Sequence, residues 1–164
     1  MGRAELIVFN DSHKGKKALY NAMNYAVAKK DKDREKIGKA RFVGGMGVDY
    51  SNIDKAVRQM RAVKKYYGKT DQRQLYHYCL SFTKDIEDAQ QVYMVGRSIA
   101  DKFFSGYQVL FAVHEDSKSR HLHIHYIVNS VSYKTGLKWH MSKKEFTEFK
   151  KKIEKSAEQL LNEW

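Results

Sequence analysis

The stretch AVHEDSKSRHLHIHYIVNS (residues 112–130) contains four of the seven histidines of the chain, and three of them alternate with apolar residues. Alternation with period two is typical of a β-strand, in which successive side chains point to opposite faces. His121, His123 and His125 therefore share one face, and the apolar residues between them point into the core. The preceding GYQVLFAVH (106–114) also reads as a strand, so the charged turn EDSKSR predicts an antiparallel hairpin.

Strand and helix patterns alternate through the rest of the chain. Further strands are expected at 5–10 and 74–82, and the glycine-interrupted ARFVGGMGVD reads as a strand or a loop. Apolar residues at helical spacing predict helices in ALYNAMNYAVAKK, SNIDKAVRQMRAVKKYYGK, DIEDAQQVYMVGRSIADKFF and the segment 142–164. We expect an α+β fold, with a central, mainly antiparallel sheet, helices packed on one face and the active site on the other.

Composition limits the class of protein and its partners. A chain of 164 residues fits one domain, 1–164, and 31 Lys and Arg against 19 Asp and Glu give a formal net charge of +12. Such a charge attracts polyanions and favours nucleic acid as partner, with a membrane surface as the weaker alternative. The single cysteine, Cys79, excludes an internal disulfide, and no apolar run has signal-peptide or transmembrane character. We expect a cytoplasmic monomer.

The histidines predict a metal site. The hairpin places His114 beside the histidine row and on the same side, and imidazole is the commonest metal ligand in proteins. A strand rise of about 3.3 Å per residue separates His121 from His125 by roughly 13 Å, so those two do not share one cation. The ligand set is therefore His114 and His123 with either His125 or His121, and the spacing alone does not choose.

The segment resembles the HUH endonucleases, named for a His-hydrophobe-His motif that His123-Ile124-His125 would form. HED, HLHIH and VNSV follow one another as in the MobA/MobP-like relaxases, and the resemblance covers residues 18–140. It implies an HUH relaxase-like fold and His114, His123 and His125 as the metal set, with His121 as a neighbour or alternative ligand.

The resemblance also implies a tyrosine nucleophile on an early helix. Two tyrosines are available in the first predicted helix. Tyr20 lies at the flank of its apolar face, whereas Tyr25 points away from that face and precedes a pair of lysines. We therefore expect Tyr25 to be the nucleophile.

Several more residues receive supporting roles. Asp116 can orient a histidine or help to take the tyrosine proton. Asn129 falls on the same side as the histidines and is a candidate for contact with DNA or with the site. His77 fits a core histidine as well as a member of the site. Lys134, Lys138 and Trp139 are candidates for DNA contact, through charge and base stacking.

By this resemblance the protein is a relaxase that nicks single-stranded DNA at the origin of transfer of a plasmid or transposon. The reaction would be a tyrosine transesterification assisted by Mg²⁺ or Mn²⁺, with a 5′-phosphotyrosyl intermediate and further transfer proteins as candidate partners. A rolling-circle replication initiator is the nearest alternative, but its tyrosine follows the HUH strand, and 142–164 has none. A non-catalytic basic DNA-binding module with a structural ion would also fit the charge, whereas a small-molecule metallohydrolase would fit the histidines alone.

Overall fold

The computed structural model describes residues 3–28, 40, 42–115 and 121–163, in which strands and helices follow the predicted order. The strands are β1 (Ala4–Phe9), β2 (Phe42–Met46), β3 (Leu75–Phe82), β4 (Val109–Glu115) and β5 (Leu122–Asn129). The helices are α1 (Ala18–Ala28), α2 (Ile53–Tyr66), α3 (Ala89–Phe103) and α4 (Lys143–Asn162). The glycine-interrupted segment is therefore a strand, β2.

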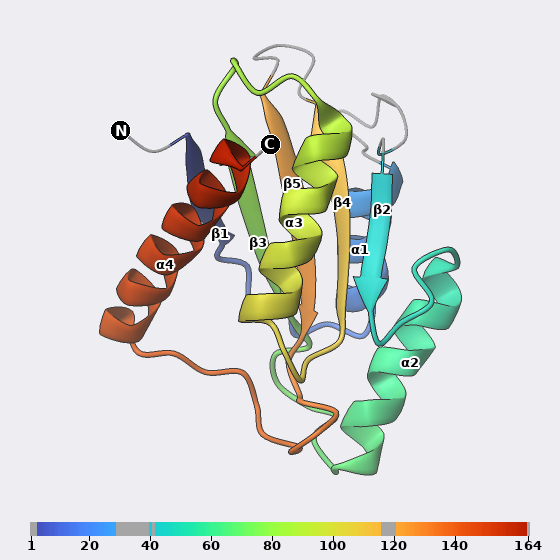
Figure 1. Cartoon of the computed structure of the whole chain (residues 1–164). Helices are drawn as coiled ribbons and strands as arrows, with labels where there is room; N and C mark the ends of the chain where they lie inside the picture. Colours follow the sequence, from blue (N-terminus) through green and yellow to red (C-terminus); the bar gives the residue numbers. More distant parts are fainter. Residues whose placement is uncertain (1–2, 29–39, 41, 116–120, 164) are drawn as a thin grey trace.

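The strands form one sheet in the order β1-β3-β5-β4-β2, and every neighbouring pair is antiparallel (Figure 1). The predicted hairpin pairs β4 with β5, and β5 occupies the centre of the sheet between β3 and β4. The α+β class and the antiparallel sheet are thus confirmed. No helix among the described residues has the length and apolarity that crossing a bilayer requires.

One face of the sheet, here called the α3/α4 face, is covered by α3 and α4 and holds the larger apolar cluster. Ile124 and Tyr126 of β5 point into it and are fully buried, as the alternation predicts. At Gly96, α3 approaches so closely that a β-carbon would lie 2.3 Å from Ile124 Cδ1. Tyr126 Oη donates a hydrogen bond to the Gly96 carbonyl at 2.9 Å, which fixes the helix on the sheet.

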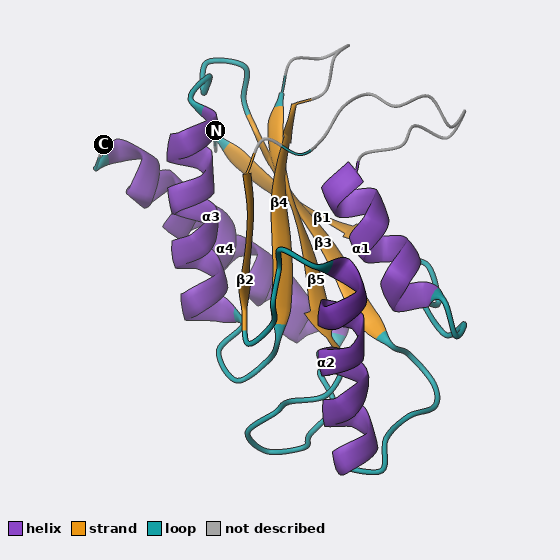
Figure 2. Cartoon of the chain, turned by 90° about the vertical axis from the view of Figure 1, so that its right-hand side faces the viewer, coloured by secondary structure: helices purple, strands orange, loops and turns teal. Residues whose placement is uncertain are grey.

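The opposite face, here called the α1/α2 face, is also covered in part by helices, which corrects one expectation. Helices α1 and α2 pack there on a second apolar cluster that includes Leu19, Met23, Met60, Leu110 and Ile127. Figure 2 shows these two helices on the side of the sheet away from α3 and α4. The prediction of helices on one face alone was wrong, because the apolar face of α1 and that of α2 both need a partner and this part of the sheet supplies it.

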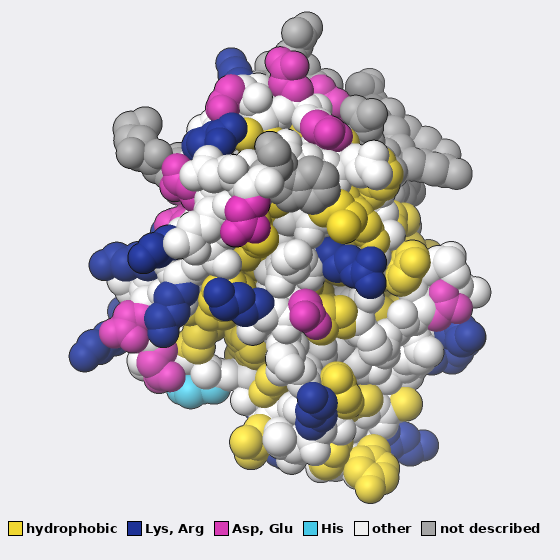
Figure 3. Space-filling model, in the orientation of Figure 1, with side chains coloured by type: hydrophobic (Ala, Val, Ile, Leu, Met, Phe, Trp, Pro, Cys, Tyr) yellow, Lys and Arg dark blue, Asp and Glu magenta, His cyan; other side chains and the backbone are white. Residues whose placement is uncertain are grey.

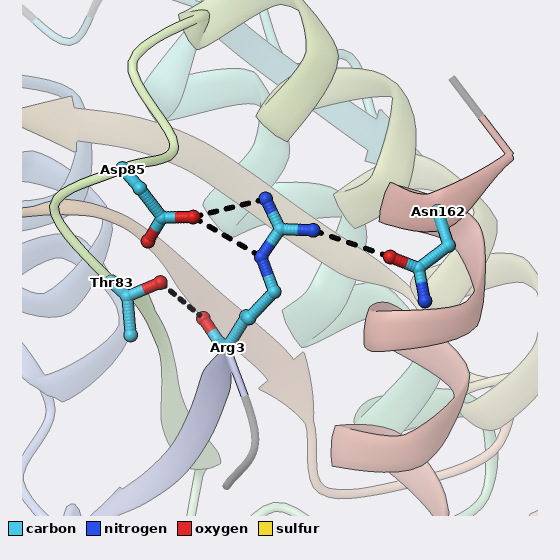
Figure 4. A network of polar contacts seen from close by, with 4 residues as sticks. All are labelled: Arg3, Thr83, Asp85 and Asn162. Atoms are coloured by element: carbon cyan, nitrogen blue, oxygen red, sulfur yellow. Dashed lines mark hydrogen bonds and ion pairs between the residues drawn. The ribbon is translucent and has the colours of Figure 1, made fainter.

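The two ends of the described chain meet beside β3 (Figure 4). The Arg3 guanidinium binds Asp85 Oδ2 at 3.1 Å and donates to Asn162 Oδ1 of α4 at 3.2 Å. The Arg3 carbonyl accepts the Thr83 N–H at 3.0 Å. These contacts tie β1 to the end of β3 and to the last helix, and so hold β1 in place at the edge of the sheet.

Candidate metal and nucleophile site

Three histidines converge on the α1/α2 face, beyond the end of its apolar cluster. His114 of β4 lies directly opposite His123 of β5 in the register, and His125 follows two residues later on the same face. One nitrogen from each ring lies within 4.8 Å of the others, and the ring centroids are 4.7–5.4 Å apart. His114 and His125 are buried, and His123 is half-buried. The register thus brings together the three residues implied by the family resemblance.

Hydrogen bonds indicate which nitrogen of each ring can act as ligand. His123 Nδ1 lies 3.1 Å from the His121 carbonyl, and His114 Nε2 is bonded to the Ala26 carbonyl of α1. A carbonyl only accepts, so these nitrogens carry the protons. The lone pairs then reside on His123 Nε2 and His114 Nδ1, and a cation would be bound through these atoms.

His77 of β3 supports this cluster, a role that the sequence left open. Its Nε2 shares a hydrogen bond of 2.9 Å with His125 Nδ1. Burial, together with the fields of His13 and His114, lowers the pKa of His77 to about 3, so the ring is neutral at physiological pH. Neutral His77 can accept the Nδ1–H of His125 and leave His125 Nε2 to face a cation. Two strands contribute the converging histidines, and a third orients one of them.

The two tyrosines of α1 lie on opposite flanks of its buried face. They are almost equally exposed, Tyr25 at 41% and Tyr20 at 43%, so exposure does not distinguish them. The Tyr25 ring lies edge-on to His125, with centroids 5.3 Å apart. Tyr20 instead lines a groove between α1 and α2 with Arg58 and Arg61. The structure therefore places Tyr25, and not Tyr20, beside the converging histidines.

The side chains of the two remaining candidates on this face lie outside the three-histidine set. His121 is half-buried, and its Nδ1 bonds the Phe82 carbonyl at 2.7 Å. Asn129 is fully buried at the far end of β5, where its amide bonds Met60 and Lys64 of α2. Its surroundings argue against DNA contact or metal ligation and indicate that it holds α2 on the sheet. Asp116 lies outside the described residues.

The residues predicted to contact DNA are scattered. Lys134 is exposed, and Lys138 is half-buried with its Nζ 3.4 Å from the Asp71 carbonyl. Trp139 packs on the α3/α4 face, and its Nε1–H donates to Tyr78 Oη at 2.9 Å. None of these three lies among the histidines, so they do not form part of the site itself.

The histidine set fits a divalent cation. Three neutral imidazoles at this separation offer three nitrogen ligands and leave further coordination positions for other atoms. Such a set adds no negative charge, so a bound cation would keep its full positive charge. Imidazole nitrogen is a common ligand for transition ions, whereas Mg²⁺ prefers oxygen.

Known proteins resemble the chain in sequence. Residues 20–160 match the relaxase family described as MobA/VirD2-like, nuclease domain. Three curated relatives, each called Protein rlx of Staphylococcus aureus, are 31% identical over 93, 129 and 147 residues. These matches cover 57%, 79% and 90% of this chain, and 28%, 36% and 40% of the respective relatives. The chain thus spans less than half the length of these relatives.

Two solved structures share the fold. One, described as the molecular basis of vancomycin resistance transfer in Staphylococcus aureus, gives a TM-score of 0.60 at 12% identity and covers 99% of this chain and 92% of that one. The second is the conjugative relaxase TrwC in complex with origin-of-transfer DNA, in a copper-bound form. It gives a TM-score of 0.53 at 15% identity and covers 98% of this chain and 69% of that one. With the fold and the match over residues 20–160 in agreement, the chain belongs to the family of MobA/VirD2-like relaxase nuclease domains.

Proposed function

We propose that this domain nicks single-stranded DNA at an origin of transfer for conjugation, with Tyr25 as the nucleophile. The observation that carries the proposal is the position of the Tyr25 ring, 5.3 Å from that of His125, at the edge of the three-histidine set. Residues 1–164 would act as one catalytic unit. The shared family supports the reaction class, and the net charge of +12 supports a polyanionic substrate.

The reaction is a transesterification. Tyr25 Oη attacks the scissile phosphorus, the Oη–P bond forms, and the bond from phosphorus to the 3′ oxygen breaks. The tyrosine proton passes to a base, for which Asp116 is the candidate, and the departing 3′ oxygen takes up a proton. One phosphodiester replaces another, so the step is reversible and the strand can be rejoined.

His114, His123 and His125 would hold the divalent cation, which supplies charge stabilisation to the phosphate oxygens. His77 fixes the orientation of His125 through their shared hydrogen bond. The Tyr25 hydroxyl belongs to α1, whose Ala26 carbonyl is bonded by His114. The chain thereby sets the distance between nucleophile and ligand set before substrate binds, which reduces the entropic cost of reaching the reactive geometry. The donor set favours Mn²⁺ over Mg²⁺.

Trapping of a covalent adduct tests the proposal. With Mn²⁺ and a single-stranded origin oligonucleotide, the protein should give a DNA adduct that survives denaturation and maps to the peptide containing Tyr25. Tyr25→Phe should remove the adduct and leave DNA binding nearly unchanged, because only the nucleophilic oxygen is lost.

Tyr20→Phe is the matched control, since it alters an equally exposed tyrosine of the same helix. If Tyr20→Phe removes the adduct and Tyr25→Phe does not, the nucleophile is misassigned. If the wild-type protein binds the oligonucleotide and forms no adduct, the domain is a non-catalytic DNA-binding module.

A further inference from the structure

A groove of about 610 Å³ opens on the α3/α4 side of the molecule, and the proposed reaction does not use it. Its walls are β1, the start of β3 and the segment 139–150, which includes the first two turns of α4. Figure 3 shows this side of the molecule, with hydrophobic side chains exposed beside α4 and both basic and acidic side chains around them. The α4 side of the groove is firmly built: Glu154 accepts the Leu6 N–H at 2.8 Å, and Lys150 donates to the Leu6 carbonyl at 3.2 Å.

The groove combines flat rings with positive charge. Tyr76, Trp139 and Phe146 line it and are only half-buried. Arg73 and Lys143 add cationic groups, and the Arg73 guanidinium lies 4.7 Å from the centre of the Tyr76 ring. Among the residues that line it there is no aspartate or glutamate. Rings on which unpaired bases can stack, next to cations that bind phosphate, are typical of surfaces that bind single-stranded nucleic acid.

Phe9 connects this groove to the histidines. Its ring packs against His77 with centroids 4.2 Å apart and stacks on His125 at 5.6 Å, and the same residue lines the groove. It ends β1, the edge strand, so among the described residues no further strand separates the two places. A DNA strand with its phosphate at the histidines on one face can therefore continue past Phe9, round the edge of the sheet, into the groove on the other side.

We infer that the groove binds the unpaired DNA that flanks the scissile phosphate on one side, with bases stacked on its rings and phosphates at Arg73 and Lys143. The inference rests on the proposed function, because that function brings single-stranded DNA to the histidines. It adds a binding subsite at a distance from the bond that is cleaved.

Trp139 provides a direct reporter, because the chain has only one other tryptophan, Trp164. In a protein carrying Trp164→Phe and Tyr25→Phe, emission comes from Trp139 alone and cleavage is blocked. An oligonucleotide of a few nucleotides centred on the scissile phosphate should bind with little change in Trp139 emission. Extension by about six nucleotides on one side should quench Trp139 by stacking, and extension on the other side should not.

Charge removal gives the second measurement. Arg73→Gln with Lys143→Gln should weaken binding of the extended oligonucleotide by about tenfold, and should lower the slope of log affinity against log salt by about 1.4, for two phosphates on a single strand. Lys151→Gln with Lys152→Gln is the matched control, since both lysines are exposed on α4 and neither lines the groove.

The outcomes separate this inference from the proposed function. Suppose that the wild-type protein forms the adduct, and that no oligonucleotide changes the emission of Trp139 in the Tyr25→Phe variant. The assignment of the groove to DNA would then be wrong and the proposed reaction would stand. A groove that binds a polypeptide instead would give this result. Quenching by the extended strand without any adduct would overturn the reaction and keep the groove. If the Arg73/Lys143 pair and the Lys151/Lys152 pair weaken binding of the extended oligonucleotide equally, the assignment of the groove is also wrong. Only the total positive charge of the protein would then affect binding.

Discussion

The two faces of the sheet are built from the same strands but serve different ends. On the α3/α4 face the inward residues of β5 are apolar along its whole length, and two helices bury them. On the α1/α2 face Ile127 of β5 is apolar and covered, whereas His123 and His125, farther from α2, are the converging imidazoles. The α3/α4 face supplies most of the apolar burial that stabilises the fold. Part of the α1/α2 face can therefore carry polar groups, although burying them costs free energy. For adjacent residues of β5, mutation on one face should therefore reduce activity, and mutation on the other face should reduce stability.

The largest effect is expected from His123→Ala compared with Ile124→Ala, two neighbours that point to opposite faces. His123→Ala should lower the nicking rate by at least about 100-fold, because a ligand for the cation is lost, and should change the free energy of unfolding little. Ile124→Ala should lower the free energy of unfolding by about 2–5 kcal/mol, because it leaves a cavity under α3.

Single-turnover nicking and urea denaturation measure these two responses, and a chelator should reproduce the His123→Ala result on the wild-type protein. Full nicking in chelator would exclude a role for the cation. A large loss of stability in His123→Ala would show that the histidines also belong to the packed core.

A smaller effect on cation binding is expected at His77. This residue also lies on the α1/α2 face, but it orients His125 and is not one of the three converging histidines. His77→Ala should weaken Mn²⁺ binding by about 10–100-fold, because the hydrogen bond that fixes the His125 ring is lost. His77→Gln should recover part of the affinity, since its amide can replace that bond.

Calorimetric titration with Mn²⁺ measures the change at His77. His121→Ala is the control, because the His121 ring bonds the Phe82 carbonyl outside the ligand set. Unchanged affinity in His77→Ala would mean that the strand alone fixes His125.

A third effect concerns the covered end of the α1/α2 face, where the amine of Lys64 is buried. Burial, together with repulsion from Arg61 and Lys138, lowers the pKa of Lys64 to about 7. Between about pH 7 and pH 10 the unfolded chain then binds one more proton at this position than the folded chain. The free energy of unfolding should therefore rise with pH in this window, by up to about 1.4 kcal/mol per pH unit from this group.

Lys64→Met should remove this part of the pH dependence, and the exposed neighbour Lys65→Met should not. Urea denaturation at several pH values gives the difference between each variant and the wild type. Parallel curves for Lys64→Met and wild type would mean that the amine keeps an ordinary pKa in the folded protein.

Periodicity predicted the order of strands and helices well, because each element carries its own apolar pattern. The alternation of histidines in β5 also brought His123 and His125 to one face. The covering of the α1/α2 face was missed, although Leu110 and Ala112 share a face of β4 with His114 and so already indicated an apolar region there. This pattern is recognised only when the part of β4 that contains Leu110 and Ala112 is considered separately from the part that contains His114.

What the sequence could not supply was the register between segments distant in the chain. His77 meets His125 only because β3 pairs with β5 at one alignment, and nothing within either strand specifies it. The same limit applies to the two tyrosines of α1. Helical spacing gives their directions relative to the apolar face, but only the docking of α1 on the sheet decides which flank meets the histidines.

The bond between His114 and the Ala26 carbonyl has a dynamic consequence. If His114 binds a cation as proposed, one imidazole contacts both that cation and the last turn of the helix that carries Tyr25, so cation binding and the docking of α1 are thermodynamically linked. Any cation that orders the His114 ring also favours the docked position of α1, and an undocked α1 weakens cation binding by the same free energy. The free energy of local opening of α1 should then increase with the fraction of protein that has a cation bound at the histidines.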